Sequence, residues 1–344
     1  MNGHITREAC RCQPGVPGLT LPDQIKILWK LSGAPVYICR YSTMLNVFEA
    51  LCEDPAVRKF RIRDLLFAEV TCPTHDGWDS QWAHVDHIVH VLTGRKTLRT
   101  CTGTWVAQPG DTLFFKKGAY FSHFEHDSDM CLLVFFIPDE FIREVVKELS
   151  AYPRAAVESQ QQRQASVIRI NNDITVQAFL QAMAVFFAGT EDPPELVLRL
   201  KLKELIASML VSARNSELAA YFRSVATLAT PCIPTIMEEN YCHNLALEAF
   251  ARLCHRSLSS FKRDFYQAYN TSPGRWLLER RLERAAHLLR NTAMNITEIL
   301  FESGFENASH FCRAFKKKFG QSPRLFRKPV PPRSRQRRSA APVP

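Results

Sequence analysis

The sequence predicts an α+β protein in which a β-rich N-terminal part precedes an all-helical C-terminal part. Between residues 37 and 137, short stretches rich in β-branched and aromatic residues are separated by glycine and proline turn signals, which is typical of antiparallel strands in a barrel or sandwich. After Pro138 the apolar residues recur every three or four positions, as in amphipathic helices. Because single cores stop growing at about 250 to 300 residues, a chain of 344 residues is expected to form two domains.

Short apolar stretches carry the β prediction. They read VYICRY, RIRDLLFAEV, HIVHVLTG, KTLRTC, TWVAQPGDTLFF and MCLLVFFI. Gly94, Gly103, the Pro109-Gly110 pair and Gly118 lie between or beside them and supply turns.

Three helices are predicted between the strands and the C-terminal part. The first, DEFIREVVKELSAY, has Asp139 in its first turn and Pro153 just past its end. Residues 174–189 and 195–213 form a hairpin of two apolar-faced helices. The second of these carries more apolar surface than one solvated helix needs, through Leu196, Leu200, Leu202, Leu205, Ile206, Met209 and Leu210. This excess predicts that residues 174–213 form a homodimer contact.

Charge is distributed unevenly along the chain. The formal net charge is +10, but residues 230–344 hold 20 Lys or Arg against 9 Asp or Glu, so this third carries the whole surplus. Clustered basic residues are what attraction to nucleic-acid phosphates requires. The prolines between residues 226 and 234 mark a linker. We therefore expect a first domain over 1–225 with the predicted oligomerisation contact, a nucleic-acid-binding domain over 234–328 and a basic disordered tail over 329–344. The family resemblance described below implies that the first domain is sensory and that the second binds DNA.

The remaining composition limits the function classes. The 11 cysteines contain no C-x-x-C pair, so reduced cysteines are expected rather than a disulfide framework or a zinc site. The N-terminus has no secretory apolar core and no apolar run reaches about 18 residues, so we expect a cytoplasmic protein without a membrane partner. No G-x-S-x-G, P-loop or G-x-G-x-x-G motif is present. The prediction is a protein that is not an enzyme and has no cofactor.

An internal repeat decides the interpretation of the C-terminal part. SLSSFKRDF begins at Ser257 and NASHFCRAF begins at Asn307, and their shared Phe, Arg and Phe positions are 50 residues apart. The same offset separates Ser272-Pro273 from Ser322-Pro323. Several positions that keep one offset rarely arise by chance, so the chain holds two copies of one structural unit.

Each copy has the pattern of the second helix of a helix-turn-helix. Ser257 and Asn307 are residue types that cap a helix N-terminus. The two phenylalanines of each copy are four residues apart, so they share a helix face and are expected to pack inward. Helices at 245–254 and 296–303, the latter ended by Gly304, complete the two units. The opposite face of each second helix is the predicted DNA surface, with Leu258, Ser259, Lys262, Arg263, Ala308, Ser309, Cys312, Arg313 and Lys316.

A long helix is predicted to join the copies. It starts at Pro273, and its apolar stripe consists of Trp276, Leu277, Leu282, Ala285, Ala286, Leu288 and Leu289. Arg280, Arg281 and Arg284 are expected outside this stripe. At about 1.5 Å per residue the helix spans roughly 25 Å. Since major-groove faces recur about every 34 Å, two recognition helices held in this way could read one duplex.

Residues 234–327 resemble the DNA-binding domain of the AraC/XylS transcription regulators. The resemblance rests on Gly304-Phe305, on the run F-C-R-A-F-K from Phe311 and on Ser322-Pro323. It implies that Ser259, Lys262, Arg263, Ser309, Cys312 and Arg313 contact bases or phosphates.

The first copy departs from this family pattern. His255 stands where a turn glycine is usual, Arg256 where an apolar residue is usual, and Tyr266 where a lysine is usual. These departures predict a strained turn or an altered base preference in the first copy.

The N-terminal strands resemble the cupin-like β-barrel sensor of the same family. The run WVAQPGDTLFFKKG, which starts at Trp105, and the strands around it are similar to ExsA-type regulators of type III secretion. The resemblance implies a cupin-like barrel with a helical hairpin, controlled by a regulatory protein or a small-molecule effector. It also implies a bacterial transcription regulator, an activator rather than a repressor, whose partners are double-stranded promoter DNA and RNA polymerase.

The histidines of the β-rich part are possible metal ligands, because metal-binding cupins use two or three His and a Glu. The available residues are His84, His87, His90, His123, His126 and Glu125. On a strand, side chains that share a face are separated by an even number of residues, so only His84 and His90 would point the same way. Scattered surface and half-buried histidines without a metal are therefore expected.

Two other functions stay open. The basic helices could dock an acidic protein and never bind DNA, which would make the chain an interaction adaptor. A metal-dependent cupin enzyme fused to a DNA-binding domain is the second alternative, and bound iron or zinc would indicate it. Sequence discrimination separates DNA reading from protein docking, whereas salt screens both attractions.

Overall fold

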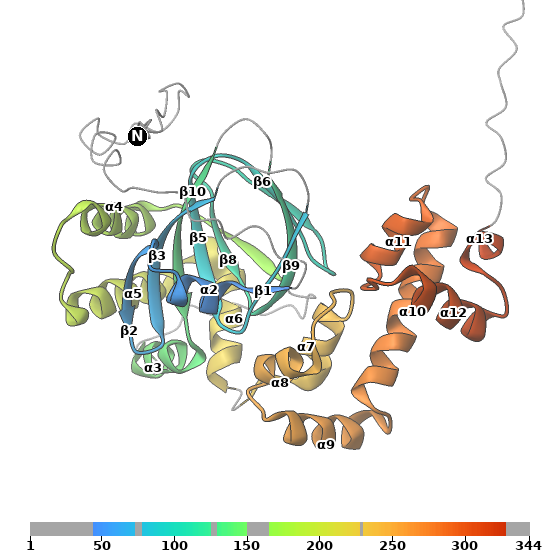
Figure 1. Cartoon of the computed structure of the whole chain (residues 1–344). Helices are drawn as coiled ribbons and strands as arrows, with labels where there is room; N and C mark the ends of the chain where they lie inside the picture. Colours follow the sequence, from blue (N-terminus) through green and yellow to red (C-terminus); the bar gives the residue numbers. More distant parts are fainter. Residues whose placement is uncertain (1–43, 73–77, 125–128, 150–164, 228–229, 328–344) are drawn as a thin grey trace, which may run out of the picture. The chain divides into compact units, whose positions relative to one another are not determined.

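The computed structural model describes residues 44–72, 78–124, 129–149, 165–227 and 230–327 (Figure 1). The chain divides into two compact units: Met1–Asn240 with Leu245–Asp264, and Tyr241–Asn244 with Phe265–Pro344. The predicted strand VYICRY and the predicted basic tail lie outside the described residues.

Two facing sheets form the β part of the first unit. One has the strand order β1-β4-β9-β6-β7, and the other has the order β11-β8-β5-β10-β3-β2. The described pairs are antiparallel except for the parallel pair of β1 and β4. The strands are β1 (Leu45–Asn46), β2 (Arg58–Ile62), β3 (Leu65–Cys72), β4 (Trp78–Ala83), β5 (Asp86–Thr93), β6 (Lys96–Arg99), β7 (Thr104–Ala107), β8 (Thr112–Phe115), β9 (Gly118–Phe124), β10 (Met130–Ile137) and β11 (Val167–Ile170). The predicted antiparallel β domain is confirmed.

Two of the predicted stretches each contain a turn. RIRDLLFAEV forms the hairpin of β2 and β3, and Arg63 between these strands has a φ of 52°. TWVAQPGDTLFF contains β7 and β8, which belong to different sheets, and Gly110 between them has a φ of 87°. A positive φ favours glycine because it lacks a Cβ, so Gly110 suits this change of sheet.

β10 separates two hydrophobic cores. Leu132, Val134 and Phe136 point into the core between the two sheets. The alternate residues, Leu133 and Phe135, point into a second core with the helices. Side chains alternate across a strand, which explains why MCLLVFFI is apolar at nearly every position.

Helices cover the outer face of the six-stranded sheet (Figure 1). The helices of the β-rich part are α2 (Val47–Glu53), α3 (Asp139–Leu149), α4 (Ile174–Ala188), α5 (Glu195–Val211), the 3-10 turn η1 (Ala213–Asn215) and α6 (Ser216–Thr227). The predicted helices α3, α4 and α5 are confirmed, whereas the sequence prediction missed α6. Of the leucines that motivated a dimer contact, Leu202 and Leu205 are buried in the helix core, and Leu196 and Leu200 are exposed.

The C-terminal part is helical at every element, as predicted. Its helices are α7 (Ile233–Asn240), α8 (Leu247–Leu253), α9 (Leu258–Tyr269), α10 (Pro273–Asn291), α11 (Ile296–Glu302), α12 (Ala308–Phe319) and α13 (Pro323–Phe326). Within the described ranges, no helix combines the length and apolar character that crossing a membrane requires. The α+β fold class, with a β domain followed by helix-turn-helix units, is therefore confirmed.

Polar contacts fix α7 and α8 to the β part within the first unit. The buried amide of Asn240 accepts a hydrogen bond from Ala119 N at 2.7 Å and donates one to Ile236 O at 2.8 Å. Arg252 pairs with Glu49 at 2.5 Å. The start of the helical part is thus anchored by Asn240, which binds a backbone group of β9, and by Arg252, which pairs with a carboxylate of α2.

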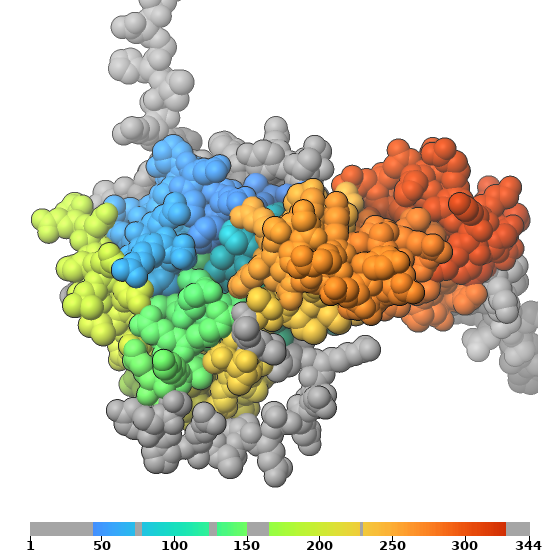
Figure 2. Space-filling model, turned by 90° about the horizontal axis from the view of Figure 1, so that it is seen from below, coloured from blue at the N-terminus to red at the C-terminus, as the bar shows by residue number. Residues whose placement is uncertain are grey.

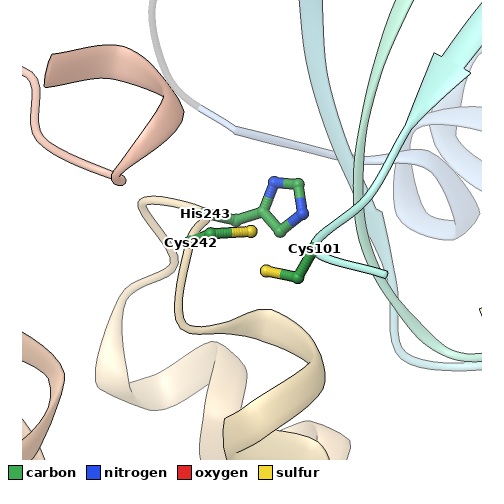
Figure 3. A group of neighbouring side chains, drawn as sticks. All are labelled: Cys101, Cys242 and His243. Carbon is green, nitrogen blue, oxygen red and sulfur yellow. The ribbon is translucent and has the colours of Figure 1, made fainter. Parts of the chain in front are cut away.

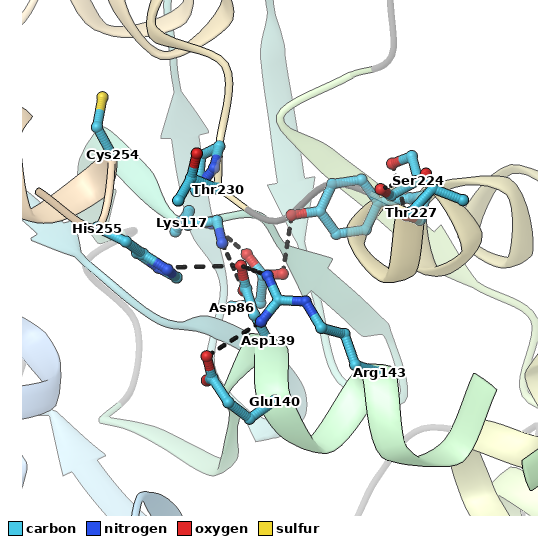
Figure 4. Close-up of polar contacts among 12 residues, drawn as sticks. Asp86, Lys117, Asp139, Glu140, Arg143, Ser224, Thr227, Thr230, Cys254 and His255 are labelled. Atoms are coloured by element: carbon cyan, nitrogen blue, oxygen red, sulfur yellow. Dashed lines mark hydrogen bonds and ion pairs between the residues drawn. The ribbon is translucent and has the colours of Figure 1, made fainter. Parts of the chain in front are cut away.

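A buried charged cluster lies beside these contacts (Figure 4). Asp86 accepts hydrogen bonds from Lys117 N at 2.7 Å and from the Tyr221 hydroxyl at 2.8 Å. The Lys117 ammonium pairs with Asp139, whose other oxygen lies 3.9 Å from His255 Nε2. Burial raises the pKa of Asp86 and, with the Asp86 carboxyl beside it, the pKa of Tyr221. Because buried charges are stable only when paired, the ion pair of Lys117 with Asp139 offsets the burial of both side chains.

Candidate nucleic-acid interface

The first recognition helix, α9, presents one buried and one exposed face. Ser257 Oγ accepts a hydrogen bond from Ser260 N at 3.2 Å, so the predicted cap is formed. Phe261 and Phe265 are fully buried. On the other face Ser259, Lys262 and Arg263 are exposed, but Leu258 is half-buried. Leu258 is therefore less available for a DNA contact than the sequence predicted.

The turn between α8 and α9 adopts a backbone that favours glycine, although it contains His255. His255 has a φ of 52°, in the left-handed region. Its N–H donates to Arg252 O at 2.9 Å, and Arg256 N donates to Ala251 O at 2.9 Å. This pattern closes the C-terminus of α8. The predicted strain at His255 is confirmed, since a left-handed residue with a Cβ costs about 1 to 2 kcal/mol.

Arg256 binds the segments around this turn together. Its guanidinium donates to Asp264 Oδ2 at 3.0 Å on α9, to Cys254 O at 2.8 Å, to Pro231 O at 3.2 Å and to Thr230 Oγ1 at 3.2 Å. The hydrogen bond from Arg256 lowers the pKa of the Asp264 carboxyl. An arginine at a usually apolar position thus supplies the turn with charge-assisted hydrogen bonds.

The second recognition helix, α12, repeats this architecture. Asn307 Oδ1 accepts a hydrogen bond from His310 N at 2.9 Å, and Phe311 and Phe315 are fully buried. The predicted DNA residues of this copy are all exposed; they are Ala308, Ser309, Cys312, Arg313 and Lys316. Gly304, with a φ of 81°, ends the preceding helix α11 as predicted.

The turn of the second copy is one residue longer than that of the first. Gly304 N donates to Phe301 O and Phe305 N donates to Leu300 O, which matches the His255 and Arg256 bonds at an offset of 49 residues. From the caps onward the offset is 50, so Glu306 is the additional residue. Phe305 therefore occupies the position of Arg256. Its ring is buried and lies 5.0 Å from that of Phe311.

Two arginines of α10 bind backbone carbonyls, and for these two the prediction that they lie outside the packed face was wrong. Arg281 donates to Tyr241 O at 2.8 Å and to His243 O at 2.7 Å. Arg284 donates to Glu302 O at 2.8 Å. Burial lowers the pKa of Arg281 to about 10. Long side chains can reach carbonyls that the helical period does not reveal, so these arginines stabilise the second unit and do not form a free basic surface.

Basic side chains on the exposed faces differ in how they are paired. Arg263 is close to Asp264, and Lys318 pairs with Glu283 at 3.0 Å. Arg313 donates only to Ser309 O, at 3.3 Å, among the partners described for it. Figure 2 shows the light orange residues of the α8 and α9 region at the surface in that view. These exposed basic side chains can therefore bind a polyanion without any buried side chain having to become exposed.

The histidines of the β part make separate contacts. His84 lies after β4 and His90 lies in β5 of the other sheet, so the prediction that they share a strand face was wrong. His87 stacks on Phe115 with centroids 5.0 Å apart, and His90 Nδ1 lies 2.9 Å from Thr112 Oγ1. Burial lowers the pKa of His84, His87 and His90 to about 4. His126 and Glu125 lie outside the described residues.

Residues of metal-binding type also occur elsewhere. Figure 3 draws Cys101, which lies between β6 and β7, and Cys242 and His243, which follow α7. Cys101 belongs to the first unit and the other two belong to the second. Residues of different units are not assigned to one metal site, and the absence of a cofactor stays a prediction.

Sequence reasoning missed the contribution of Asp264. Its carboxylate lies between Arg256 and Arg263, but the repeat pattern drew attention only to the shared Phe and Arg positions. A signal was present, because the matching position 50 residues later is Ala314. Comparing the two copies position by position would have singled out this charge difference.

Comparisons with known proteins match both parts of the chain. Residues 86–221 match the ExsA N-terminal regulatory domain, and residues 250–329 match a helix-turn-helix domain. The virulence regulon transcriptional activator VirF of Yersinia enterocolitica is 25% identical over 238 residues, which cover 69% of this chain and 87% of VirF. The regulator ExsA of Pseudomonas aeruginosa is 26% identical over 233 residues, which cover 68% of this chain and 82% of ExsA. Among solved structures, an apo ToxT variant of Vibrio cholerae covers 76% of this chain and 96% of its own, at 13% identity and a TM-score of 0.37.

Proposed function

Because the chain joins an ExsA-type N-terminal regulatory domain to an AraC-type helix-turn-helix domain, as AraC/XylS regulators do, we propose that it regulates transcription by reading promoter DNA with two recognition helices. The relatives VirF and RhaS are transcriptional activators by name, which favours activation for this chain. The resemblance that the sequence predicted is confirmed by these matches.

The main support for this proposal is that α9 and α12 are capped in the same way and expose the same helix face. In both copies two buried phenylalanines fix the helix, and an arginine follows the first phenylalanine by two residues on the exposed face. A structural role alone needs the buried face but not a repeated exposed arginine. Repetition of the exposed face is what reading two half-sites requires.

The proposed roles follow from side-chain chemistry. Arg263 and Arg313 would each bind guanine O6 and N7 in bidentate fashion, which is worth about 1 to 3 kcal/mol of discrimination. Lys262 and Lys316 would bind phosphates, which adds affinity without sequence preference. Ser259, Ser309 and Cys312 are short enough to contact base edges directly, and Ala308 would allow close approach of the helix.

The β part favours control by a protein over control by a small molecule. Its interior cavity is about 50 Å³ and is lined mainly by apolar side chains, among them Val70, Leu98 and Val134. Small-molecule pockets usually measure about 300 to 1,000 Å³. We therefore propose that a regulatory protein binds the N-terminal domain.

Further partners belong to the same proposal. Activation would involve contact with RNA polymerase, and action on promoter DNA would place the chain in the cytoplasm. The exposed Leu196 and Leu200 on α5 would form a homodimer contact. We propose domain limits of 1–225 and 234–328, and no enzymatic role.

Selection from a random duplex pool tests the function. The full chain is incubated with the pool at about 150 mM salt, where charges are screened over about 8 Å, and the retained DNA is sequenced. We expect two short conserved blocks about 10 base pairs apart. Arg263→Ala should erase preference in one block, and Arg313→Ala should erase it in the other. No enrichment would contradict DNA reading and favour the adaptor alternative.

A further inference from the structure

We propose that Asp264 is a positioning residue that restrains Arg263 on the first recognition helix and weakens its attraction to phosphates, so that the first copy trades affinity for base discrimination. The inference rests on the proposed reading of DNA by α9. It assigns a task to a residue on the recognition helix that the AraC-type pattern does not single out.

Arg263 is held at two points of its own helix. Its Nε donates to Asp264 Oδ1 at 3.2 Å, and its Nη2 donates to Ser260 Oγ at 3.2 Å. The Arg263 side chain is nevertheless 69% exposed, so a base or phosphate can reach it. The contacts fix the direction of the guanidinium without burying it.

Asp264 is itself fixed by the first copy's turn. Its second oxygen accepts from Arg256 Nε at 3.0 Å and from Ser260 Oγ at 3.4 Å. Arg256 in addition binds the carbonyls of Cys254 and Pro231. Since one carboxylate oxygen is bound to this turn, the other stays beside Arg263.

The second copy keeps the arginine, as Arg313, but lacks the carboxylate and the turn arginine that hold it in the first copy. Ala314 replaces Asp264, and Phe305 replaces Arg256. Among the described residues, no carboxylate pairs with Arg313. The same chain thus has a restrained arginine, Arg263, and an arginine without such a restraint, Arg313.

The carboxylate affects correct and incorrect DNA contacts differently. A phosphate attracts Arg263 mainly through charge, and Asp264 offsets that charge and repels the phosphate. A guanine edge also needs a fixed direction of the guanidinium, which Asp264 provides. Removing the negative charge of Asp264 should therefore strengthen binding to a duplex without the correct bases more than binding to the correct duplex.

Asp264→Asn is the variant that tests this, because asparagine can still accept the hydrogen bond from Arg256. Binding of the full chain to the selected duplex and to a scrambled duplex is measured by fluorescence anisotropy at about 150 mM salt. Exposed ion pairs are worth about 0.2 to 1 kcal/mol, so we expect Asp264→Asn to bind the scrambled duplex about 1.5- to 5-fold tighter. The ratio of selected to scrambled affinity should fall by a similar factor. In an Arg263→Ala background the same change should have a clearly smaller effect, because only the direct repulsion between the carboxylate and the phosphates remains to be removed.

Two controls separate the possible causes. Asp64→Asn makes the same charge change at an exposed position between β2 and β3 and should leave both affinities unchanged. Thermal unfolding of each variant reports whether the fold is intact. Equal binding by Asp264→Asn and wild type, or an equal effect with and without Arg263, would overturn the inference. If the wild-type chain selects no duplex at all, the proposed function fails first, and this inference fails with it.

Discussion

The two helix-turn-helix copies close the helix before the turn with the same pair of backbone hydrogen bonds, but they fix the turn through different chemistry. In the first copy, Arg256 fixes the turn with hydrogen bonds to Asp264 and to carbonyls. In the second copy, Phe305 occupies the same position and packs on Phe311. The shared features are local to each helix, namely the cap and the two buried phenylalanines. Either side chain can fix the turn, because Arg256 hydrogen-bonds to polar neighbours and Phe305 packs on an apolar one.

The two turns also differ in their need for glycine. A Cβ on Gly304 would lie 2.9 Å from Cys242 O and 2.9 Å from Arg281 Nε, which is too close. His255 has a similar φ but a side chain that lies beside Asp139. Left-handed backbone strain is thus accepted where a side chain has space, whereas lack of space makes glycine necessary.

Removing a buried phenylalanine from α9 or α12 should change stability more than the other substitutions described below. The two losses show whether these helices are equally well packed. Phe261→Ala and Phe311→Ala each remove a fully buried ring, so each should lower the free energy of unfolding by about 3 to 5 kcal/mol. Urea unfolding of the full chain measures this change. Lys262→Ala and Ser309→Ala are exposed controls and should cost less than about 0.5 kcal/mol. A cost below about 1 kcal/mol for either phenylalanine would show that its helix is not part of a cooperative core.

The next effect concerns the turns. Gly304→Ala should cost about 2 kcal/mol or more, because left-handed strain of about 1 to 2 kcal/mol is added to the close contact with Cys242 O. His255→Ala at the matching position should change stability by less than about 1 kcal/mol, since that strain already exists there. Thermal unfolding compares the two. Similar costs at both positions would contradict the argument from space.

Replacing the turn arginine of the first copy by an apolar residue should have a smaller effect on stability. Arg256→Leu introduces an apolar residue, as in the second copy, but leaves Asp264 without its partner. Losing charge-assisted hydrogen bonds should cost about 1 to 2 kcal/mol in urea unfolding. The double variant Arg256→Leu with Asp264→Ala places an apolar residue and an alanine at these positions, similar to Phe305 and Ala314 of the second copy, and should recover part of this loss. An additive cost in the double variant would argue against coupling of the two positions.

The smallest effect concerns phosphate contacts. Lys262 and Cys312 occupy matching exposed positions, and Cys312 carries a free thiol. Cys312→Lys should steepen the dependence of log affinity on log salt by about 0.9, and Lys262→Cys should reduce it by about the same amount. Titrations of one duplex at several salt concentrations measure the slope. Cys312→Ser is the control and should leave the slope unchanged.

Much of the candidate site followed from the sequence because it depends on neighbours along the chain. The 50-residue offset located both recognition helices, and eight of the nine predicted surface residues are exposed. Leu258 is half-buried because the first turn of α9 also packs inward. Whether these residues bind DNA as assigned stays a prediction. In the β part, β1, β4, β9, β11, α2 and α6 were missed. Polar residues interrupt the apolar pattern of β4 and β9, which weakens the strand periodicity.

The order of the β and helical parts, the two caps, the buried phenylalanines and the position of Gly304 could all be predicted from the amino-acid sequence. These features depend on helical period, capping chemistry and backbone freedom, which act over a few residues. Three other features became visible only in the folded chain: Arg281 and Arg284 bind carbonyls, Asp139 lies near His255, and Asp264 links Arg256 to Arg263. Each of these needs a group whose direction, or whose distant partner, is fixed only after the chain has folded, because long charged side chains can satisfy many alternative partners.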